Sequence, residues 1–371
     1  MIKHYTGIIE HYRGRLPVSL STPVVSLGEG NTPLIELKNL PSLLQFDARI
    51  LVKFEGLNPT GSFKDRGMTM AVTKAVEAGS KAIICASTGN TSASAAAYAA
   101  RAGIISFVLI PEGKIAFGKL SQAMMHGAVV IQIRGNFDDG MRLVQEVARD
   151  VPVTIVNSIN PYRLQGQKTA AFEIIEELGD APDFHALPVG NAGNITAHWI
   201  GYSEAAGLPT ATAPADMHVS DKRVFSSRRP MMLGYQAAGS APFMRGKMVE
   251  NPDTVATAIR IGHPMSWNHA WIVREESSGW FGERTDEEIL YVQKLLARHE
   301  GIFCEPASAA SVAGVLRDIT EGRIPPGATI VCTLTGHGLK DPDTAIAQSS
   351  RPVSVDASRD AIEAVIISNM S

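Results

Sequence analysis

A lysine behind a Pro/Gly turn is the first residue of this sequence that could do covalent chemistry. In the segment Asn58–Met68, NPTGSFKDRGM, the turn leads into a helical pattern, so Lys64 lies in the first turn of the expected helix, with Asp65 and Arg66 placed to brace it. The positive helix end and burial both favour a neutral amine, which lowers the pKa toward what imine formation needs. A solvated surface lysine is the commoner alternative, so this turn alone does not decide the chemistry.

A second polar turn follows the strand-like run KAIICA and opens a helix of small residues. It offers hydroxyl, amide and backbone N–H groups, which together could hold an anion or a carboxylate. An ordinary helix cap is the alternative, because serine, threonine and asparagine all serve in that position. The turn has more polar residues than one cap requires, and the candidates are Ser87, Thr88, Asn90 and Thr91.

A third turn connects the strand-like run HALPV to a helix. Glycine permits positive φ and close approach of the backbone, so N–H groups at the positive helix end can converge on a phosphate. The turn matches neither the dinucleotide fingerprint nor a Walker loop, and a tight connection without a ligand is the alternative. The expected phosphate-binding residues are Gly190, Asn191, Ala192, Gly193 and Asn194.

A fourth turn, Thr335–Pro342, follows the strand-like run TIVCTL. Open α/β sheets collect ligand groups at the carboxyl ends of their strands, so this turn belongs with the other three. His337 and Lys340 are weaker candidates for a catalytic role, because a histidine between glycines is often only a polar turn residue.

Alternating strand and helix patterns would position these turns. Strand-like runs such as RILVKFE, KAIICAS, ISFVLIPE and VVIQIRG alternate with helical stretches over about 64–77, 92–102, 119–125 and 138–150, and the rhythm resumes after Asn160. This order predicts an α/β fold of parallel or mixed sheets with helices on both faces. Because 371 residues exceed what one core usually serves, we expect two domains.

Two segments depart from this rhythm. Residues 208–230 are rich in Pro, Ala, Thr, Ser and Arg without any period, which indicates a loop insertion. Residues 346–371 are a polar tail with one short apolar run, AIEAVII, and form either a docking helix or a frayed end.

Composition excludes several classes of partner. A net charge of −3 without a long basic run argues against nucleic acids and anionic membrane surfaces. No run is apolar enough to span a bilayer, and the first residues lack the apolar stretch of a signal peptide. The three cysteines, Cys85, Cys304 and Cys332, lie far apart, so we expect no disulfide framework, no metal site and a cytoplasmic location.

Five segments together resemble the threonine synthase family, in its short, fold type II branch of pyridoxal-phosphate enzymes. They are EGNTPLIEL, KFEGLNPTGSFKDRGM, STGNTSAS, GNAGN and LTGHGLKDP, and they extend over most of the chain. The motif NPTGSFKDRG alone is shared with serine and threonine dehydratases and cysteine synthase, whereas the ending TGHGLKDP is closer to threonine synthases.

The resemblance implies a two-domain fold with the cofactor, pyridoxal phosphate, in the cleft between the domains. Residues 1–54 and 158–345 would form a large cofactor-binding domain, and residues 55–157 a small substrate-binding domain. Lys64 would carry the cofactor as a Schiff base, Asn90 would contact its phenolic oxygen and Gly190–Asn194 its phosphate. Thr335 would face the pyridine nitrogen, where a neutral hydroxyl supports ring protonation less than a carboxylate does.

The reaction that the resemblance implies converts O-phosphohomoserine and water into threonine and phosphate. Lys64 would move the α and β protons, while the turn Ser87–Thr91 would orient the substrate carboxylate. The substrate phosphate needs a second anion site, for which an arginine has the right geometry. The expected residues are Asn157, Ser158 and Arg163, with Thr91 and Lys168 contributing, and the alternative is that Arg163 and Lys168 are solvated helix residues.

Other functions stay open at this point. A hydroxyamino-acid dehydratase would share the Lys64 chemistry but eliminate at the β carbon without a phosphate pocket. A catalytically silent cofactor-binding protein and a nucleotide-binding protein are more distant alternatives. A homodimer is common in the superfamily, and the chain shows no extension of the kind that makes plant enzymes respond to S-adenosylmethionine, so we expect no such activation.

Overall fold

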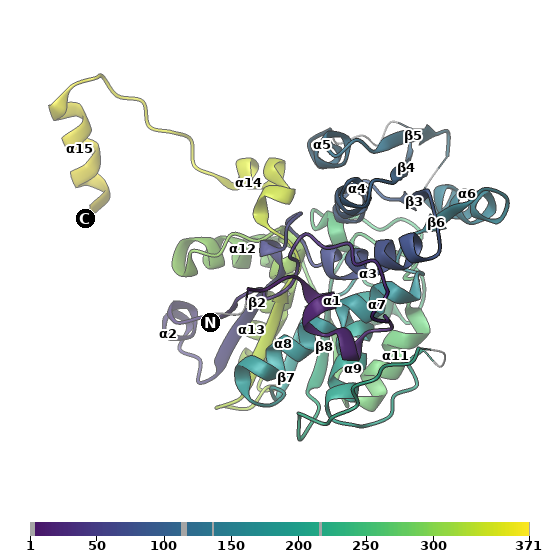
Figure 1. Cartoon of the computed structure of the whole chain (residues 1–371). Helices are drawn as coiled ribbons and strands as arrows, with labels where there is room; N and C mark the ends of the chain where they lie inside the picture. The colour runs from purple at the N-terminus through teal and green to yellow at the C-terminus, as the bar shows by residue number, and fades with distance from the viewer. Residues whose placement is uncertain (1–3, 113–116, 136, 215–216, 371) are drawn as a thin grey trace.

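Two separate sheets organise the chain (Figure 1). The structure is a computed structural model that describes residues 4–112, 117–135, 137–214 and 217–370. In the first sheet the strand order is β1-β2-β10-β7-β8-β9, and every neighbouring pair is parallel except β1 with β2. Its strands are β1 (Leu34–Glu36), β2 (Arg49–Phe54), β7 (Phe184–Pro188), β8 (Met231–Ala237), β9 (Trp280–Arg284) and β10 (Thr329–Leu334).

The second sheet is parallel throughout, with the order β5-β4-β3-β6. Its strands all come from residues 55–157 and those of the first sheet from 1–54 and 158–345, so the strands divide at the expected boundaries. That the two parts are separate domains with separate ligands stays a prediction. The strands of this sheet are β3 (Ala82–Ala86), β4 (Ile105–Pro111), β5 (Val129–Ile133) and β6 (Val153–Ile155).

Helices cover the sheets, and the α/β prediction is confirmed. Helix α13 packs on β7, β8 and β10, and α4 and α6 pack on β3 and β4. The helices are α1 (Ile8–His11), α2 (Asn39–Leu44), α3 (Lys64–Glu77), α4 (Asn90–Ala102), α5 (Phe117–Met125), α6 (Phe137–Asp150), α7 (Pro161–Gln167), α8 (Thr169–Leu178), α9 (Gly193–Ala205), α10 (Pro242–Arg245), α11 (Trp267–Glu276), α12 (Asp286–Glu300), α13 (Pro306–Thr320), α14 (Pro342–Gln348) and α15 (Arg359–Met370), with single 3-10 turns η1 (Arg13–Arg15), η2 (Glu55–Leu57), η3 (Thr257–Ile259) and η4 (Gly338–Lys340).

One central strand of each sheet is buried along its whole length, as expected for a parallel strand with two covered faces. All residues of β3 and β7 are buried, whereas the edge strand β5 is mostly exposed. Helix α3 begins at Lys64 as expected. Helix α4 begins two residues earlier than the pattern suggested, since Gly89 takes the N-cap position and Asn90 is already helical.

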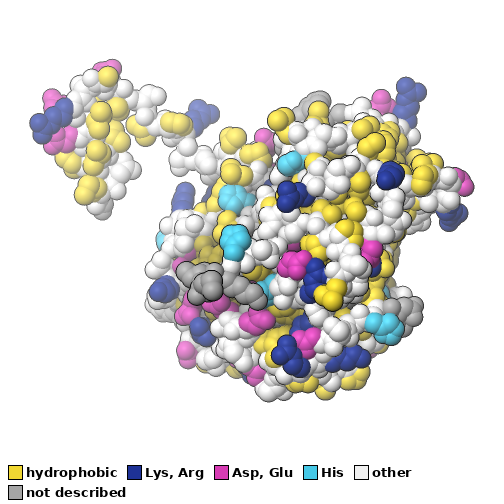
Figure 2. All heavy atoms as spheres, viewed as in Figure 1, with side chains coloured by type: hydrophobic (Ala, Val, Ile, Leu, Met, Phe, Trp, Pro, Cys, Tyr) yellow, Lys and Arg dark blue, Asp and Glu magenta, His cyan; other side chains and the backbone are white. Residues whose placement is uncertain are grey.

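The loop at 208–230 is attached to the rest of the chain, whereas the helix at the end of the tail is not packed against it. Apart from 215–216, which lie outside the described residues, 208–230 form neither helix nor strand, and Arg15 anchors them by donating to the carbonyl oxygen of Arg223 at 2.7 Å. The tail ends in α15, which stands apart from the rest of the chain in Figures 1 and 2 and has no buried residue. It is therefore a helix, but it does not dock on its own chain.

No helix of the described residues is both long and apolar enough to cross a membrane.

Candidate active site

The four polar turns all follow the carboxyl ends of strands or begin helices, where α/β sheets bind ligands. The turn before Lys64 is tied to the loop after β10 by backbone hydrogen bonds, from Phe63 N to Thr335 O at 3.0 Å and from His337 N to Gly61 O at 2.9 Å. Residues far apart in sequence are thereby fixed next to each other, and Lys64 lies beside the end of β10.

Lys64 has the electrostatic character that the sequence predicts. Burial of its amine, reinforced by the positive charge of Arg163 and opposed by Glu305, lowers its pKa to about 7. The amine nitrogen lies 4.3 Å from the centroid of the Phe63 ring. A lysine with this pKa is largely neutral just above pH 7, so it can act as a nucleophile and as a base.

Asn90 and Thr335 meet at one buried carboxylate. Asn90 Nδ2 donates to Glu305 Oε2 at 3.0 Å and to Oε1 at 3.3 Å, and Thr335 Oγ1 donates to Oε1 at 3.2 Å. Asn90 begins α4, which follows β3 of the second sheet, and Thr335 follows β10 of the first sheet, so the structure brings the two residues together from different parts of the chain. No motif predicts Glu305, although its position directly before the proline that starts α13 is a signal that could have been used.

The turn at Ser87–Thr91 is not an ordinary side-chain cap. Gly89 is the N-cap of α4 and no side chain caps this helix, while Ser92 Oγ bonds back to Gly89 O at 2.8 Å. Ser87, Thr88, Asn90 and Thr91 are all partly exposed. The helix start therefore keeps N–H groups and hydroxyls near Lys64 that suit a carboxylate.

The turn Gly190–Asn194 presents the start of α9, which has no side-chain cap. Ala192 adopts φ 63, a left-handed conformation that costs an alanine of order 1 kcal/mol and marks a constrained turn. Asn194 is used structurally, because its Nδ2 donates to Pro188 O at 2.7 Å. Backbone N–H groups rather than the Asn194 side chain are thus the groups suited to a phosphate.

Arg163 is a buried cation without an anionic partner among the described residues. It is 1% exposed, and its Nη1 donates only to Val156 O at 3.2 Å. Within the described part of the chain its Nε and Nη2 have no hydrogen-bond partner, and burial lowers its pKa to about 10. Such a group indicates an anion site, because a buried unpaired charge is costly unless a ligand balances it.

The other residues expected at the phosphate site have different positions. Asn157 braces the end of β3, accepting from Ala86 N at 3.1 Å and donating to Ala86 O at 3.0 Å, and Ser158 is partly exposed. Lys168 is buried and donates to Gln165 Oε1 at 2.7 Å and Glu204 Oε2 at 2.6 Å. The ammonium of Lys168 is thus already paired with the carboxylate of Glu204.

Asp65 and Arg66 do brace the helix that carries Lys64. Asp65 accepts from Thr60 N at 2.7 Å and Ser94 Oγ at 2.6 Å. Arg66 lies between two carboxylates, with Nε at 2.7 Å from Glu55 Oε2 and Nη1 at 2.6 Å from Glu173 Oε1. The buried pairing with Glu55 and Glu173 is not visible in any sequence motif.

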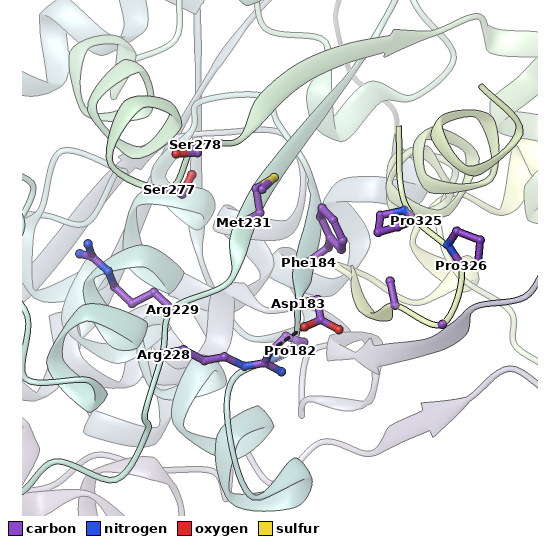
Figure 3. Close-up of a pocket in the computed structure, with 12 residues that line it drawn as sticks. Pro182, Asp183, Phe184, Arg228, Arg229, Met231, Ser277, Ser278, Pro325 and Pro326 are labelled. Atoms are coloured by element: carbon purple, nitrogen blue, oxygen red, sulfur yellow. Dashed lines mark hydrogen bonds and ion pairs between the residues drawn. The ribbon is translucent and has the colours of Figure 1, made fainter. Parts of the chain in front are cut away.

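A surface hollow away from Lys64 is another candidate ligand site. Figure 3 shows it at the amino ends of β7 and β8, lined by Pro182, Phe184, Arg229 and Met231 among others, with Arg228 paired to Asp183 at 2.6 Å. Open α/β sheets bind ligands at the opposite, carboxyl edge. We therefore place the candidate active site at Lys64 and not in this hollow.

The residues around Lys64, among them Asn90, Glu305 and Thr335, are suited to binding pyridoxal phosphate. A lysine with a pKa of about 7 suits covalent attachment of its carbonyl, and the uncapped start of α9 suits its phosphate. The Asn90 amide and the Thr335 hydroxyl supply polar contacts beside them.

Comparisons with known proteins agree with this chemistry. A family profile described as pyridoxal-phosphate dependent enzyme matches residues 25–336. A threonine synthase of Synechocystis is 56% identical over 94% of this chain and 87% of its own, and one of Mycobacterium tuberculosis is 57% identical over 95% and 94%. A third, from Methanocaldococcus jannaschii, is 48% identical over 96% of this chain and 86% of its own.

Solved structures share the fold at low sequence identity. Maize serine racemase superposes with a TM-score of 0.70 at 17% identity, covering 99% of this chain and 100% of its own. O-ureido-L-serine synthase superposes with a TM-score of 0.70 at 18% identity, covering 92% and 99%. These structures establish the architecture of the chain.

Proposed function

The chain belongs to the pyridoxal-phosphate-dependent enzymes and, within them, to the threonine synthase family, and on this premise we propose that it converts O-phospho-L-homoserine and water into L-threonine and phosphate. The observation that carries the proposal is the buried, unpaired guanidinium of Arg163, whose charge acts on the Lys64 amine. A dehydratase substrate has no phosphate and would leave that cation unbalanced.

We assign cofactor binding to the residues that surround Lys64. Lys64 would hold the cofactor covalently, Asn90 and Thr335 would contact its ring, and the backbone of Gly190–Asn194 would bind its phosphate. When bound, pyridoxal phosphate supplies an electron sink for the negative charge that develops on the substrate carbons.

The substrate would bind through two anion sites. The turn at Ser87–Thr91, together with the start of α4, would orient the carboxylate, and the Nε and Nη2 groups of Arg163 would bind the phosphate. Asn157 and Ser158 remain proposed contributors, whereas the Lys168 ammonium is held by Gln165 and Glu204 and is not expected to contact the phosphate. Holding the substrate at both ends fixes its α and β carbons relative to Lys64.

Lys64 would then perform the proton transfers. With a pKa of about 7, its Nζ can accept the proton from the α carbon and later one from the β carbon at neutral pH. Lys64 releases each proton before it accepts the next. After phosphate leaves, the γ carbon gains a proton and becomes the methyl group. Water then adds its hydroxyl at the β carbon, the α carbon regains its proton, and the remaining proton of water goes to phosphate. Arg163 would stabilise the departing phosphate.

Substrate turnover distinguishes this activity from its alternatives. Purified protein loaded with pyridoxal phosphate is incubated with O-phosphohomoserine, and threonine and inorganic phosphate are measured together. We expect equal amounts of both, with no keto acid. Release of a keto acid from serine or threonine, without activity on phosphohomoserine, would instead identify a dehydratase.

We further propose that the enzyme works as a homodimer in the cytoplasm. The three cysteines are free and buried, which suits a reducing compartment. Light scattering during size-exclusion chromatography tests the assembly: a mass near twice 39.7 kDa is expected, and a monomer mass would contradict the proposal.

A further inference from the structure

Glu305 is an acid buried at the centre of the proposed cofactor site. Glu305 is 4% exposed, and among the described residues its side chain accepts hydrogen bonds from Asn90 and Thr335, which are both neutral. No described lysine or arginine lies within 4.0 Å of its carboxylate. A buried carboxylate held only by neutral donors is costly, so its presence calls for a reason other than stability.

The backbone directs this carboxylate into the site. Glu305 occupies the N-cap of α13 with φ −65 and ψ 155, but its side chain makes no capping hydrogen bond. Its N–H donates to Gly336 O at 3.0 Å. A Cβ added at Gly336 would lie 2.6 Å from the Glu305 carboxyl carbon, so the acid rests directly against the end of β10 and a side chain at position 336 would displace it.

The charges that act on Glu305 come from two elements, α3 and η4. Lys64 on α3 and Lys340 on η4 stabilise its ionised form, while burial is the larger effect and raises its pKa. The neighbouring Cys304 thiol has its pKa raised by burial and by the Glu305 charge. Toward Lys64, Glu305 and Arg163 act in opposite directions, since the carboxylate favours a protonated nitrogen and the guanidinium disfavours it.

Resting on the proposed function, we infer that Glu305 is a positioning residue of the cofactor site: its carboxylate holds the Asn90 amide and the Thr335 hydroxyl and balances the positive charge at Lys64. Asn90 Nδ2 carries two hydrogens, so it can donate one to Glu305 and the other to the cofactor. Thr335 Oγ1 donates to Glu305 Oε1 at 3.2 Å and also lies 3.0 Å from Ser308 Oγ, so with Ser308 as the donor one oxygen lone pair stays available to the ring. Glu305 therefore fixes the direction of both contacts.

The test follows the visible absorption of the cofactor-loaded protein as a function of pH. Removing the carboxylate charge with Glu305→Gln makes protonation of the nitrogen on Lys64 less favourable, so the midpoint should move to lower pH by about one unit. Arg163→Met should move it to higher pH. The matched control is Glu29→Gln, because Glu29 is another buried glutamate with a raised pKa, hydrogen-bonded by Tyr98 and Ser26.

The midpoint of Glu29→Gln should equal that of the wild type. Equal midpoints in wild type, Glu305→Gln and Glu29→Gln would overturn the role of Glu305 while leaving the proposed function intact. A wild-type protein without any visible band would overturn the proposed function as well.

A second variant keeps the test decisive if Glu305→Gln does not fold. Glu305→Asp retains the charge but is too short to hold Asn90 and Thr335 in the same place. Its midpoint should stay near that of the wild type, while the dissociation constant for pyridoxal phosphate should rise about tenfold, the loss of one hydrogen bond to a charged group. An unchanged dissociation constant would contradict the inference.

Discussion

Two buried arginines on helices that pack together have opposite surroundings. Arg66 on α3 and Arg163 on α7 are each 1% exposed. Arg66 donates to both carboxylates of Glu55 and Glu173, whereas Arg163 donates to one backbone oxygen and leaves Nε and Nη2 unpaired. A buried guanidinium with two carboxylates is complete as a structural group, and one without any is suited to an anionic ligand.

Arg66 and Lys64, the two basic residues in the first turn of α3, also differ in their partners. Lys53 and Arg66 both form ion pairs with Glu173, and these pairs hold the first turn of α3 in place. Lys64, two residues before Arg66, lies under the influence of Arg163 and has its pKa lowered. The helix is thus anchored by paired charges and carries at its start an amine that loses its charge near pH 7.

The largest expected effect comes from breaking the satisfied cluster. Arg66→Met should destabilise the protein by about 4 kcal/mol, because Glu55 and Glu173 would remain buried without their cation. Denaturant unfolding measures it. Arg49→Met is the control: Arg49 pairs with Glu36 at the surface, with side chains 50% and 44% exposed, so its loss should cost less than about 1 kcal/mol. Similar losses of unfolding free energy in Arg66→Met and Arg49→Met would contradict the claim that the buried ion pairs of Arg66 matter more than the surface pair of Arg49.

Lys64→Met should stabilise the cofactor-free protein, by about 3 kcal/mol at pH 7, although it abolishes turnover. The folded pKa of about 7 lies below the ordinary value of 10.5, so between them the unfolded chain binds more protons and wild-type stability rises with pH. The advantage of the variant is therefore greatest below pH 7 and fades toward pH 10.5. Thermal unfolding of both proteins across this range measures it, and a pH-independent difference would contradict the lowered pKa.

Arg163→Met should weaken substrate binding without weakening the fold. We expect KM for O-phosphohomoserine to rise about 100-fold, since a charge-assisted contact with phosphate is lost, while the free energy of unfolding stays equal or increases. Steady-state kinetics and denaturant unfolding provide the two readouts. An unchanged KM, or a large loss of stability, would place Arg163 with Arg66 as a structural residue.

The smallest effect is expected at Lys168. Its ammonium is occupied by Gln165 and Glu204, so Lys168→Met should change KM within about twofold. A rise in KM comparable to that of Arg163→Met would show that Lys168 reaches the substrate, as the sequence pattern suggested.

Local signals predict the fold and the turns of the site. The Pro/Gly turn before Lys64 sets the start of α3, and the small-residue turn before α9 predicts a helix N-terminus open to an anion. Alternating strand and helix patterns predict parallel sheets, because each βα turn then lies at the same edge of its sheet.

Long-range pairing could not be predicted in the same way. Whether Arg163 or Lys168 meets a carboxylate depends on how α7, α8 and α9 pack, and no local pattern in the sequence indicates that Glu204 pairs with Lys168 and with Arg15. Likewise, Glu305 meets Asn90 and Thr335 only because two sheets bring their strand ends together. Local patterns place residues on elements, while the partners of buried charges are decided by tertiary packing.

The most direct test of the account asks where the cofactor is attached. Protein loaded with pyridoxal phosphate should absorb visible light, and borohydride should fix the cofactor permanently on the chain. Peptide mass spectrometry after reduction should then find the added mass on the peptide that contains Lys64, and nowhere in the Lys64→Met variant. Attachment at another lysine, or a colourless protein that takes up no cofactor, would contradict it.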